Sequence, residues 1–263
     1  MKPFSQFPEN WKKNIRYVLT DIDDTLTNNG RLPAVAYNAM ERLQNTGISV
    51  IPITGRPAGW CDHIARMWPV NGLVGENGAF YFYYDEKNKK MLRRYWKPGS
   101  ERLEDRRKLD KIKHKILEQF PSCRVASDQN YREADLAIDY CEDVPPMPME
   151  EVEKIVRCFT KEGAVAKISS IHVNGWFGNY DKLAMTRIFL EEVFRAKTEK
   201  IKEHIVFTGD SPNDAPMFDY FPHSVGMANI LRFKKNLTHQ PAWVTKNEGG
   251  YGFAEMVDSL LSL

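Results

Sequence analysis

Tyr17-Val18-Leu19-Thr20-Asp21-Ile22-Asp23-Asp24-Thr25-Leu26-Thr27 is an apolar, β-favouring stretch that ends in three carboxylates and a hydroxyl group. We predict a strand that ends at a functional site. Carboxylates this close repel one another, so Asp21 and Asp23 stay ionised together only with a cation or with alternating protonation. The structural alternative is an acidic turn that caps the next helix. An EF-hand is excluded because Thr25 is a poor ligand and Leu26 stands where the loop requires glycine.

The composition is that of an ordinary globular protein. The chain has 263 residues, of which 42% are hydrophobic and 27% charged, so it is long enough for two domains. Its net charge of +2 gives no general reason to expect nucleic acid or an acidic membrane as a partner. Four widely spaced cysteines form no CxxC pair, and no apolar run approaches membrane-spanning length. We therefore expect a cytoplasmic protein with no membrane partner.

Strand and helix patterns alternate at both ends of the chain. Further strands are predicted at residues 48–53, 72–74, 79–84, 205–208, 224–228 and 242–245. Helices are predicted at residues 32–44, 59–68, 182–194 and 253–261. The nearly all-apolar strand at 48–53 is typical of a sheet covered by helices on both faces. The sequence therefore predicts an α/β fold with a Rossmann-like parallel sheet.

The middle of the chain has a different pattern. Helices at residues 100–120 and 149–161 and strands at 134–140 and 164–173 predict a compact α+β insert. Residues 86–118 hold thirteen Lys and Arg against six Asp and Glu. The helical spacing turns most of these charges toward water, which favours a solvated face over a nucleic-acid surface. We predict a core of residues 1–84 and 180–263, with an inserted domain at 85–179.

Polar side chains follow three of the predicted core strands. Asp21 and Asp23 follow the first, Thr54 follows the second, and Asp210 and Asp214 follow a later one. In an open parallel sheet, ligands bind outside the carboxyl ends of the strands. Four carboxylates that converge there require a hard divalent cation, and a ligand set made only of oxygen favours Mg²⁺.

The order of these motifs resembles the haloacid dehalogenase (HAD) superfamily of phosphohydrolases. The resemblance is carried by Asp21-x-Asp23-x-Thr25, Thr54-Gly55-Arg56, Lys182 and Gly209-Asp210-Ser211-x-Asn213-Asp214. The insert between the second motif and the lysine is similar to the type IIB cap of the Cof-like, sucrose-phosphatase-like and mannosylglycerate-phosphatase-like enzymes. The resemblance implies a HAD core with an inserted cap that selects the substrate.

This resemblance also implies a role for each motif. Asp21 is expected to be the nucleophile that forms an aspartyl phosphate, and Asp23 the general acid and base. Mg²⁺ is expected to be held by Asp21, Asp210, Asp214 and the carbonyl group of Asp23. The groups expected to bind phosphoryl oxygens are Thr54, the backbone amide of Gly55, Lys182 and Asn213. Lys182 would also add positive charge.

Several alternatives remain open at this point. Arg56 is as well explained by substrate binding as by pairing with an acid.

Other classes of protein with this core are also considered. Ile22 and Asp23 argue against a dehalogenase, which lacks the second aspartate, and against a P-type ATPase, which has lysine and threonine there. A phosphomutase of the phosphomannomutase type shares the core and cap class. A non-catalytic binder of sugar phosphates is less favoured because every catalytic motif is intact. The leading prediction is a Mg²⁺-dependent phosphatase that acts on a sugar phosphate or a similar small ester.

Overall fold

The computed structural model describes residues 1–235 and 237–262. Its central sheet has six strands, all parallel, in the order β1-β13-β12-β11-β2-β3. The strands are β1 (Lys2–Pro3), β13 (Trp243–Val244), β12 (His223–Gly226), β11 (Ile205–Gly209), β2 (Tyr17–Thr20) and β3 (Ser49–Pro52). The predicted α/β fold with a parallel sheet is thus confirmed.

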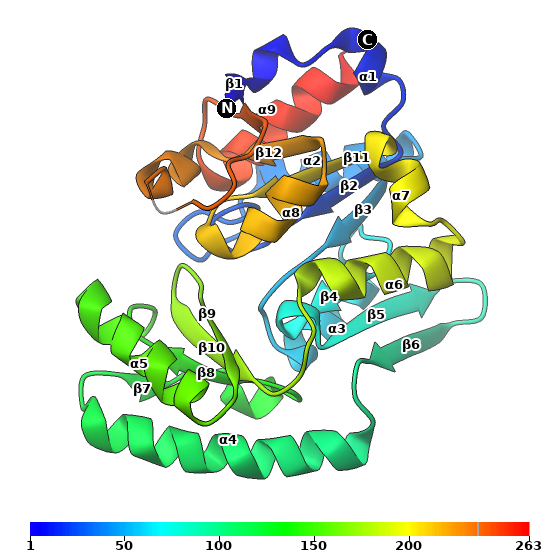
Figure 1. The fold of residues 1–263 in the computed structure, drawn as a ribbon. Helices are drawn as coiled ribbons and strands as arrows, with labels where there is room; N and C mark the ends of the chain where they lie inside the picture. The colour runs from blue at the N-terminus through cyan, green and yellow to red at the C-terminus, as the bar shows by residue number, and fades with distance from the viewer. Residues whose placement is uncertain (236, 263) are drawn as a thin grey trace.

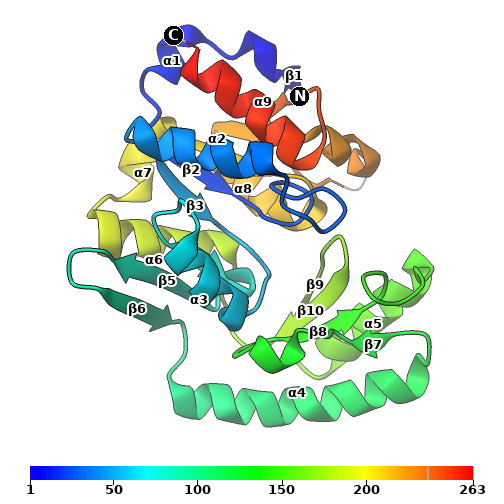
Figure 2. The same cartoon turned by 180° about the vertical axis from the view of Figure 1, so that it is seen from behind.

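Helices cover both faces of this sheet (Figures 1 and 2). One face packs against α2 (Ala34–Asn45) and α9 (Gly249–Leu261), and the other against α6 (Lys182–Phe194) and α8 (Ala215–Tyr220). Successive strand residues face opposite sides, so Val18 joins the first apolar cluster and Leu19 the second. Both faces are buried, which explains the continuous apolar sequence of the strands. The remaining short helices of this part are α1 (Glu9–Lys12) and α7 (Thr198–Ile201).

A second, antiparallel sheet extends the core beyond β3. It consists of β4 (Leu73–Gly75), β5 (Phe80–Asp85) and β6 (Lys90–Tyr95), and α3 (Ala58–Met67) packs beside it. The strand β6 was not predicted, because its basic residues were read as part of the insert. The domain boundary predicted at residue 85 falls inside the β5–β6 hairpin. Because β6 pairs with β5, we propose that the first crossing lies at residues 96–98.

The inserted domain has its own sheet and its own apolar core. Its antiparallel strands are β7 (Arg124–Val125), β8 (Leu136–Asp139), β10 (His172–Trp176) and β9 (Val165–Ile168). The helices α4 (Gly99–Gln119) and α5 (Met149–Lys161) pack on this sheet through Ile116, Phe159 and other buried residues. The single strand predicted at 164–173 is wrong. That stretch contains a turn at 169–171 and supplies a β-hairpin instead.

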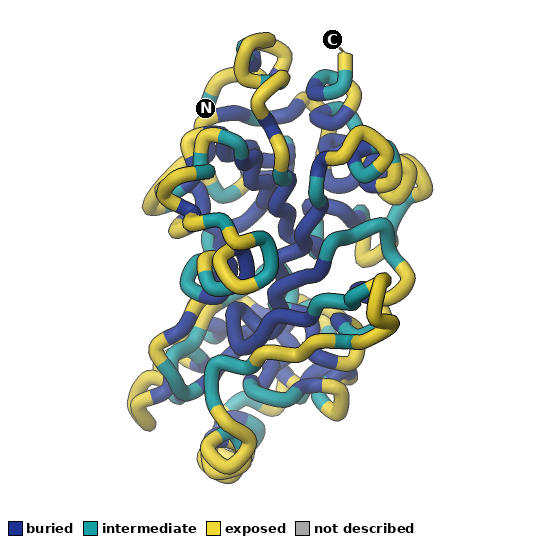
Figure 3. Tube along the Cα trace, turned by 90° about the vertical axis from the view of Figure 1, so that its right-hand side faces the viewer, coloured by how far each residue is buried: buried dark blue, intermediate teal, exposed yellow. Residues whose placement is uncertain are grey.

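The β9–β10 hairpin extends from the insert toward the carboxyl ends of the core strands (Figure 1). Buried chain runs through the middle of the molecule, and exposed chain lies mainly on its outside (Figure 3). The carboxylate of Glu76, in the core, accepts hydrogen bonds from the backbone N–H groups of residues 133–135 of the insert and of Ala58 of α3. Arg132 of the insert donates to the Gly55 carbonyl at 3.0 Å. These contacts fix the insert on the core beside the second motif. Within residues 1–235 and 237–262, no helix combines the length and the apolar character needed to cross a bilayer.

Candidate active site

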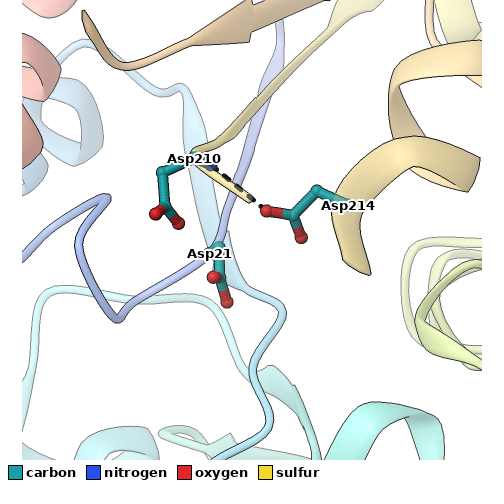
Figure 4. Close-up of side chains that lie close together, drawn as sticks. All are labelled: Asp21, Asp210 and Asp214. Atoms are coloured by element: carbon teal, nitrogen blue, oxygen red, sulfur yellow. Dashed lines mark hydrogen bonds between the residues drawn. The ribbon is translucent and has the colours of Figure 1, made fainter. Parts of the chain in front are cut away.

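Three predicted metal ligands converge at the carboxyl edge of the central sheet. Asp21 follows β2, Asp210 follows β11, and Asp214 lies one turn further on (Figure 4). One oxygen from each lies within 4.8 Å of the other two, and all three residues are buried. The strands β2 and β11 are paired in register, with Thr20 opposite Thr208, so the residues that follow them emerge side by side.

The turn that carries Asp210 and Asp214 has a defined local structure. The Asp214 Oδ2 atom accepts the N–H groups of Asp210 at 3.2 Å and Ser211 at 3.4 Å. A β-carbon at Gly209 would lie 2.5 Å from the same oxygen, so this position requires glycine. Asp214 is the third residue of the 3-10 turn Pro212–Asp214, and its side chain completes a capping box with Ser211. Its second oxygen, Oδ1, points elsewhere and contacts Lys182.

Lys182 is the first residue of α6 and is 5% exposed. Its Nζ atom donates to Asp21 Oδ1 at 3.0 Å and to Asp214 Oδ1 at 2.8 Å. Although burial opposes its charged form, these two carboxylates raise the pKa of Lys182. The lysine is therefore a fixed positive charge beside the predicted nucleophile.

The negative charge of this cluster exceeds the charge of its lysine. Burial raises the pKa of Asp21 to about 7, against the attraction of Lys182 and with help from Asp214 and Asp23. Burial and the neighbouring Asp21 and Asp214 also raise the pKa of Asp210 well above its ordinary value. Three converging oxygen ligands with unbalanced charge fit a hard divalent cation such as Mg²⁺. The Asp23 side chain lies outside this cluster of three.

Two residues to which the sequence analysis gave no role, Thr25 and Asn229, hold the Asp210 carboxylate in place. Thr25 donates its hydroxyl to Asp210 Oδ1 at 3.1 Å, and Asn229 donates its amide to Oδ2 at 3.2 Å. Asn229 also donates to the Asp24 carbonyl at 2.8 Å and accepts the Gly249 N–H at 3.1 Å. Thr25 belongs to the first motif, and Asn229 follows β12. Asn229 directly follows the strand predicted at residues 224–228. A search for polar residues after that strand, like the search made after the other strands, would have found it.

Asp23 and Arg56 form a second part of the site. The Arg56 Nε atom donates to both oxygens of Asp23, at 2.9 and 3.1 Å, and Nη2 lies 2.8 Å from Asp23 Oδ1. The guanidinium also contacts Glu142, from the insert, at 2.9 Å. Of the two roles considered for Arg56, the structure shows the ion pair with an acid.

A narrow cavity joins these groups, with room for about 20 Å³, on the order of one water molecule. The core residues that line it are Asp21, Asp23, Gly55, Arg56, Ser211 and Asn213. The insert contributes Arg132, Ser169, Ser170, Ile171, His172 and Asn174. Thr54 is fully buried, and its hydroxyl accepts the Arg56 N–H at 3.0 Å. The insert thus closes over the site with mainly polar side chains.

A larger groove of about 580 Å³ lies between the β5–β6 hairpin, α3 and α4. Three of its arginines already have partners: Arg93 with Asp62, Arg102 with Glu133, and Arg106 with the Arg132 carbonyl. Cations that are already paired offer little to a ligand. The converging carboxylates, rather than the volume of this groove, therefore identify the active site.

Solved structures share this fold over nearly the whole chain. A protein of Thermoplasma acidophilum is 19% identical with a TM-score of 0.69, covering 94% of this chain and 98% of its own. A haloacid dehalogenase-like hydrolase from Bacteroides thetaiotaomicron is 16% identical with a TM-score of 0.64, covering 94% and 100%. The sucrose-phosphatase of Synechocystis, in complex with sucrose and phosphate, is 12% identical with a TM-score of 0.62, covering 93% and 97%. At these identities, the likeness shows the fold.

Residues 18–104 match the sequence model of the haloacid dehalogenase-like hydrolase family. This stretch of the sequence is similar to the HAD-like hydrolases. The match includes the first two motifs, and the structural neighbours share the fold of the inserted domain as well as that of the core. No curated protein matches the chain at a significant level. The inserted domain, called the cap below, meets the core at the carboxyl ends of the strands, where Asp21, Asp210 and Asp214 lie.

Proposed function

We propose that the protein is a Mg²⁺-dependent phosphatase that hydrolyses a small phosphorylated metabolite through a phosphorylated Asp21. One observation carries this proposal: Asp21, Asp210 and Asp214 converge in a buried cluster with the ammonium group of Lys182 among them. The match of residues 18–104 to a family of hydrolases and the phosphatases among the structural neighbours support a phosphoric monoester hydrolase.

The chemistry follows from the charges around the reacting groups. When bound by Asp21, Asp210, Asp214 and the Asp23 carbonyl, Mg²⁺ would offset the repulsion between the carboxylates and a phosphate dianion. An Asp21 oxygen forms a bond to phosphorus while the bond from phosphorus to the leaving oxygen breaks. Lys182 stabilises the charge on the phosphoryl oxygens, and Gly55 and Asn213, which border the cavity, are the proposed additional donors.

Asp23 is the proposed proton carrier. In the first step its carboxyl group gives a proton to the leaving oxygen, and in the second it takes a proton from the water that attacks the phosphorylated Asp21. That water releases inorganic phosphate and restores the Asp21 carboxylate. Asp23 borders the same cavity as Asp21, as this sequence of proton transfers requires.

The cap lining supports a polar, hydroxyl-bearing leaving group. Ser169, Ser170, His172 and Asn174 offer hydroxyl, imidazole and amide groups to the cavity. The two arginines that border it, Arg56 and Arg132, are already paired with carboxylates. We therefore propose a phosphorylated sugar or related polyol as the substrate. A cytoplasmic location is part of the proposal, on the basis of the four free cysteines.

Phosphate release from a panel of phosphorylated sugars, sugar acids and small aryl phosphates tests this function. Activity is expected with Mg²⁺ and should disappear with EDTA. Asp214→Ala should lower the affinity for Mg²⁺ and so raise the Mg²⁺ concentration needed for activity. The matched control is Asp219→Ala, which changes an exposed aspartate of α8. Absence of metal-dependent turnover on every ester would contradict the proposal. Transfer of the phosphoryl group to another hydroxyl of the same sugar would instead identify a phosphomutase.

A further inference from the structure

Arg56 connects the proposed general acid in the core with a carboxylate of the cap. Its Nε and Nη2 atoms hold the carboxylate of Asp23 at two points, and Nη2 also lies 2.9 Å from Glu142 Oε1. Its third nitrogen, Nη1, lies 3.5 Å from Asp128 of the cap. The guanidinium stacks 4.4 Å from the ring centre of Trp60. Every nitrogen of this guanidinium group therefore has an acidic partner, two of which belong to the cap.

Glu142 is itself held rigidly. It lies in the turn after β8, where the Asp139 carboxylate accepts the backbone N–H groups of residues 141, 142 and 143 at 2.7 to 2.9 Å. Its second oxygen, Oε2, lies 2.9 Å from His172 Nε2. Although burial favours the neutral acid, contacts with His172 and Arg56 lower the pKa of Glu142 to about 2. Glu142 is thus a fixed negative charge that the cap presents to Arg56.

We propose that Glu142 is a positioning residue, which through Arg56 sets the orientation of the Asp23 carboxyl group when the cap is closed. The inference rests on the proposed function, in which Asp23 transfers the proton. A carboxyl group held at two points by one guanidinium has its plane fixed, whereas a single contact leaves it free to rotate. Because Glu142 and Asp128 move with the cap, opening of the cap removes both of these partners of Arg56, and Glu142 is the one that shares Nη2 with Asp23. Proton transfer is therefore coupled to cap closure.

The first test is Glu142→Gln, which removes the charge and keeps the shape. A misplaced acid slows substrates whose leaving oxygen needs a proton and has little effect on those whose leaving oxygen does not. We expect kcat for glycerol phosphate to fall roughly 10-fold with KM nearly unchanged, and kcat for p-nitrophenyl phosphate to change less than about 2-fold. The matched control is Glu162→Gln, which breaks an exposed ion pair of the cap, with Lys115, that does not line the cavity. It should leave both substrates unaffected.

A double-mutant cycle tests whether the effect passes through Arg56. In Arg56→Lys, a single ammonium cannot hold both oxygens of Asp23 and Glu142 at once. If the two residues act in series, the double variant loses about as much as the worse single variant rather than the product of both losses. Multiplicative losses, equal losses on both substrates, or a rise in KM at constant kcat would overturn the inference. An inactive wild-type protein would instead reject the proposed function, so the two failures are distinguishable.

Discussion

The Nζ atom of Lys182 donates a hydrogen bond to Asp21 Oδ1 at 3.0 Å, although the two residues are 161 positions apart in the chain. Asp21 directly follows strand β2, and Lys182 begins the helix that follows the cap. At this point the chain passes very close to Gly78, where a β-carbon would lie 2.1 Å from the Asp181 carbonyl oxygen. The return of the chain from the cap thus places the lysine among the carboxylates.

The balance of charge in this cluster predicts the behaviour of Lys182→Met. The substitution leaves buried Asp21 and Asp214 without their common partner, which costs roughly 3–5 kcal/mol of unfolding free energy in the absence of metal. Mg²⁺ should restore a large part of this loss, because it supplies the missing positive charge. Denaturant unfolding with Mg²⁺ and with EDTA measures both effects. Equal stability of the variant under the two conditions would show that the cluster holds no cation.

The raised pKa values predict how the stability of the metal-free protein depends on pH. The pKa of Asp21 is raised from 3.8 to about 7, and that of Asp210 is raised as well, so the folded protein binds these protons more tightly than the unfolded chain. Their stabilising contribution is complete below the unfolded pKa and is lost as pH rises through the folded pKa. In EDTA, Asp210→Asn should therefore gain stability relative to the wild type as the pH rises above the unfolded pKa of an aspartate, because the variant has no carboxyl group at this position to lose a proton. A difference that stays constant with pH would contradict the assignment.

Proton transfer by Asp23 predicts a dependence on the leaving group. Asp23→Asn keeps the side-chain shape but cannot exchange a proton, so turnover of alkyl phosphates should fall roughly 10²- to 10⁴-fold. An activated aryl phosphate, whose leaving oxygen needs less help, should lose less. Rates for the two substrate types with the same purified variant make the comparison. Equal losses on both types would exclude the proton-transfer role.

Glu76 fixes the cap on the core, and its replacement should loosen that joint. The Glu76 carboxylate is fully buried and accepts N–H groups from Ala58 and from residues 133–135 through both oxygens. Glu76→Gln would turn an amide NH₂ group toward some of these donors, at a cost of roughly 2–4 kcal/mol. Amide hydrogen exchange at residues 133–135 should become faster. Glu133→Gln, which changes a more exposed carboxylate in the same segment, is the control. Unchanged exchange in Glu76→Gln would rule out this role of Glu76.

The motifs in the sequence predicted those parts of the site that follow strand ends. Asp21, Asp210 and Asp214 could be placed together because carboxyl ends of parallel strands share one edge of a sheet. No sequence pattern predicts the contacts of Glu142 or Glu76, because their partners are a guanidinium group and backbone N–H groups that are distant in sequence. The strand β6 was missed because Arg93 and Arg94 made it look like an exposed charged segment. Helices α5 and α6 were predicted with their observed limits; a proline break marks the start of α5 in the sequence, and the structure shows that the Asp181 side chain caps α6.

Phosphorylation of Asp21 during turnover is the most direct test of the central claim. The wild-type protein is mixed with Mg²⁺ and an active phosphate ester, quenched in acid within a single turnover, and digested for peptide mass spectrometry. We predict one added phosphoryl group on the peptide that contains Asp21, located at that residue and absent from Asp21→Asn, which should fold normally and release no phosphate. Rapid turnover with unmodified Asp21, or near-normal activity of Asp21→Asn, would contradict the mechanism.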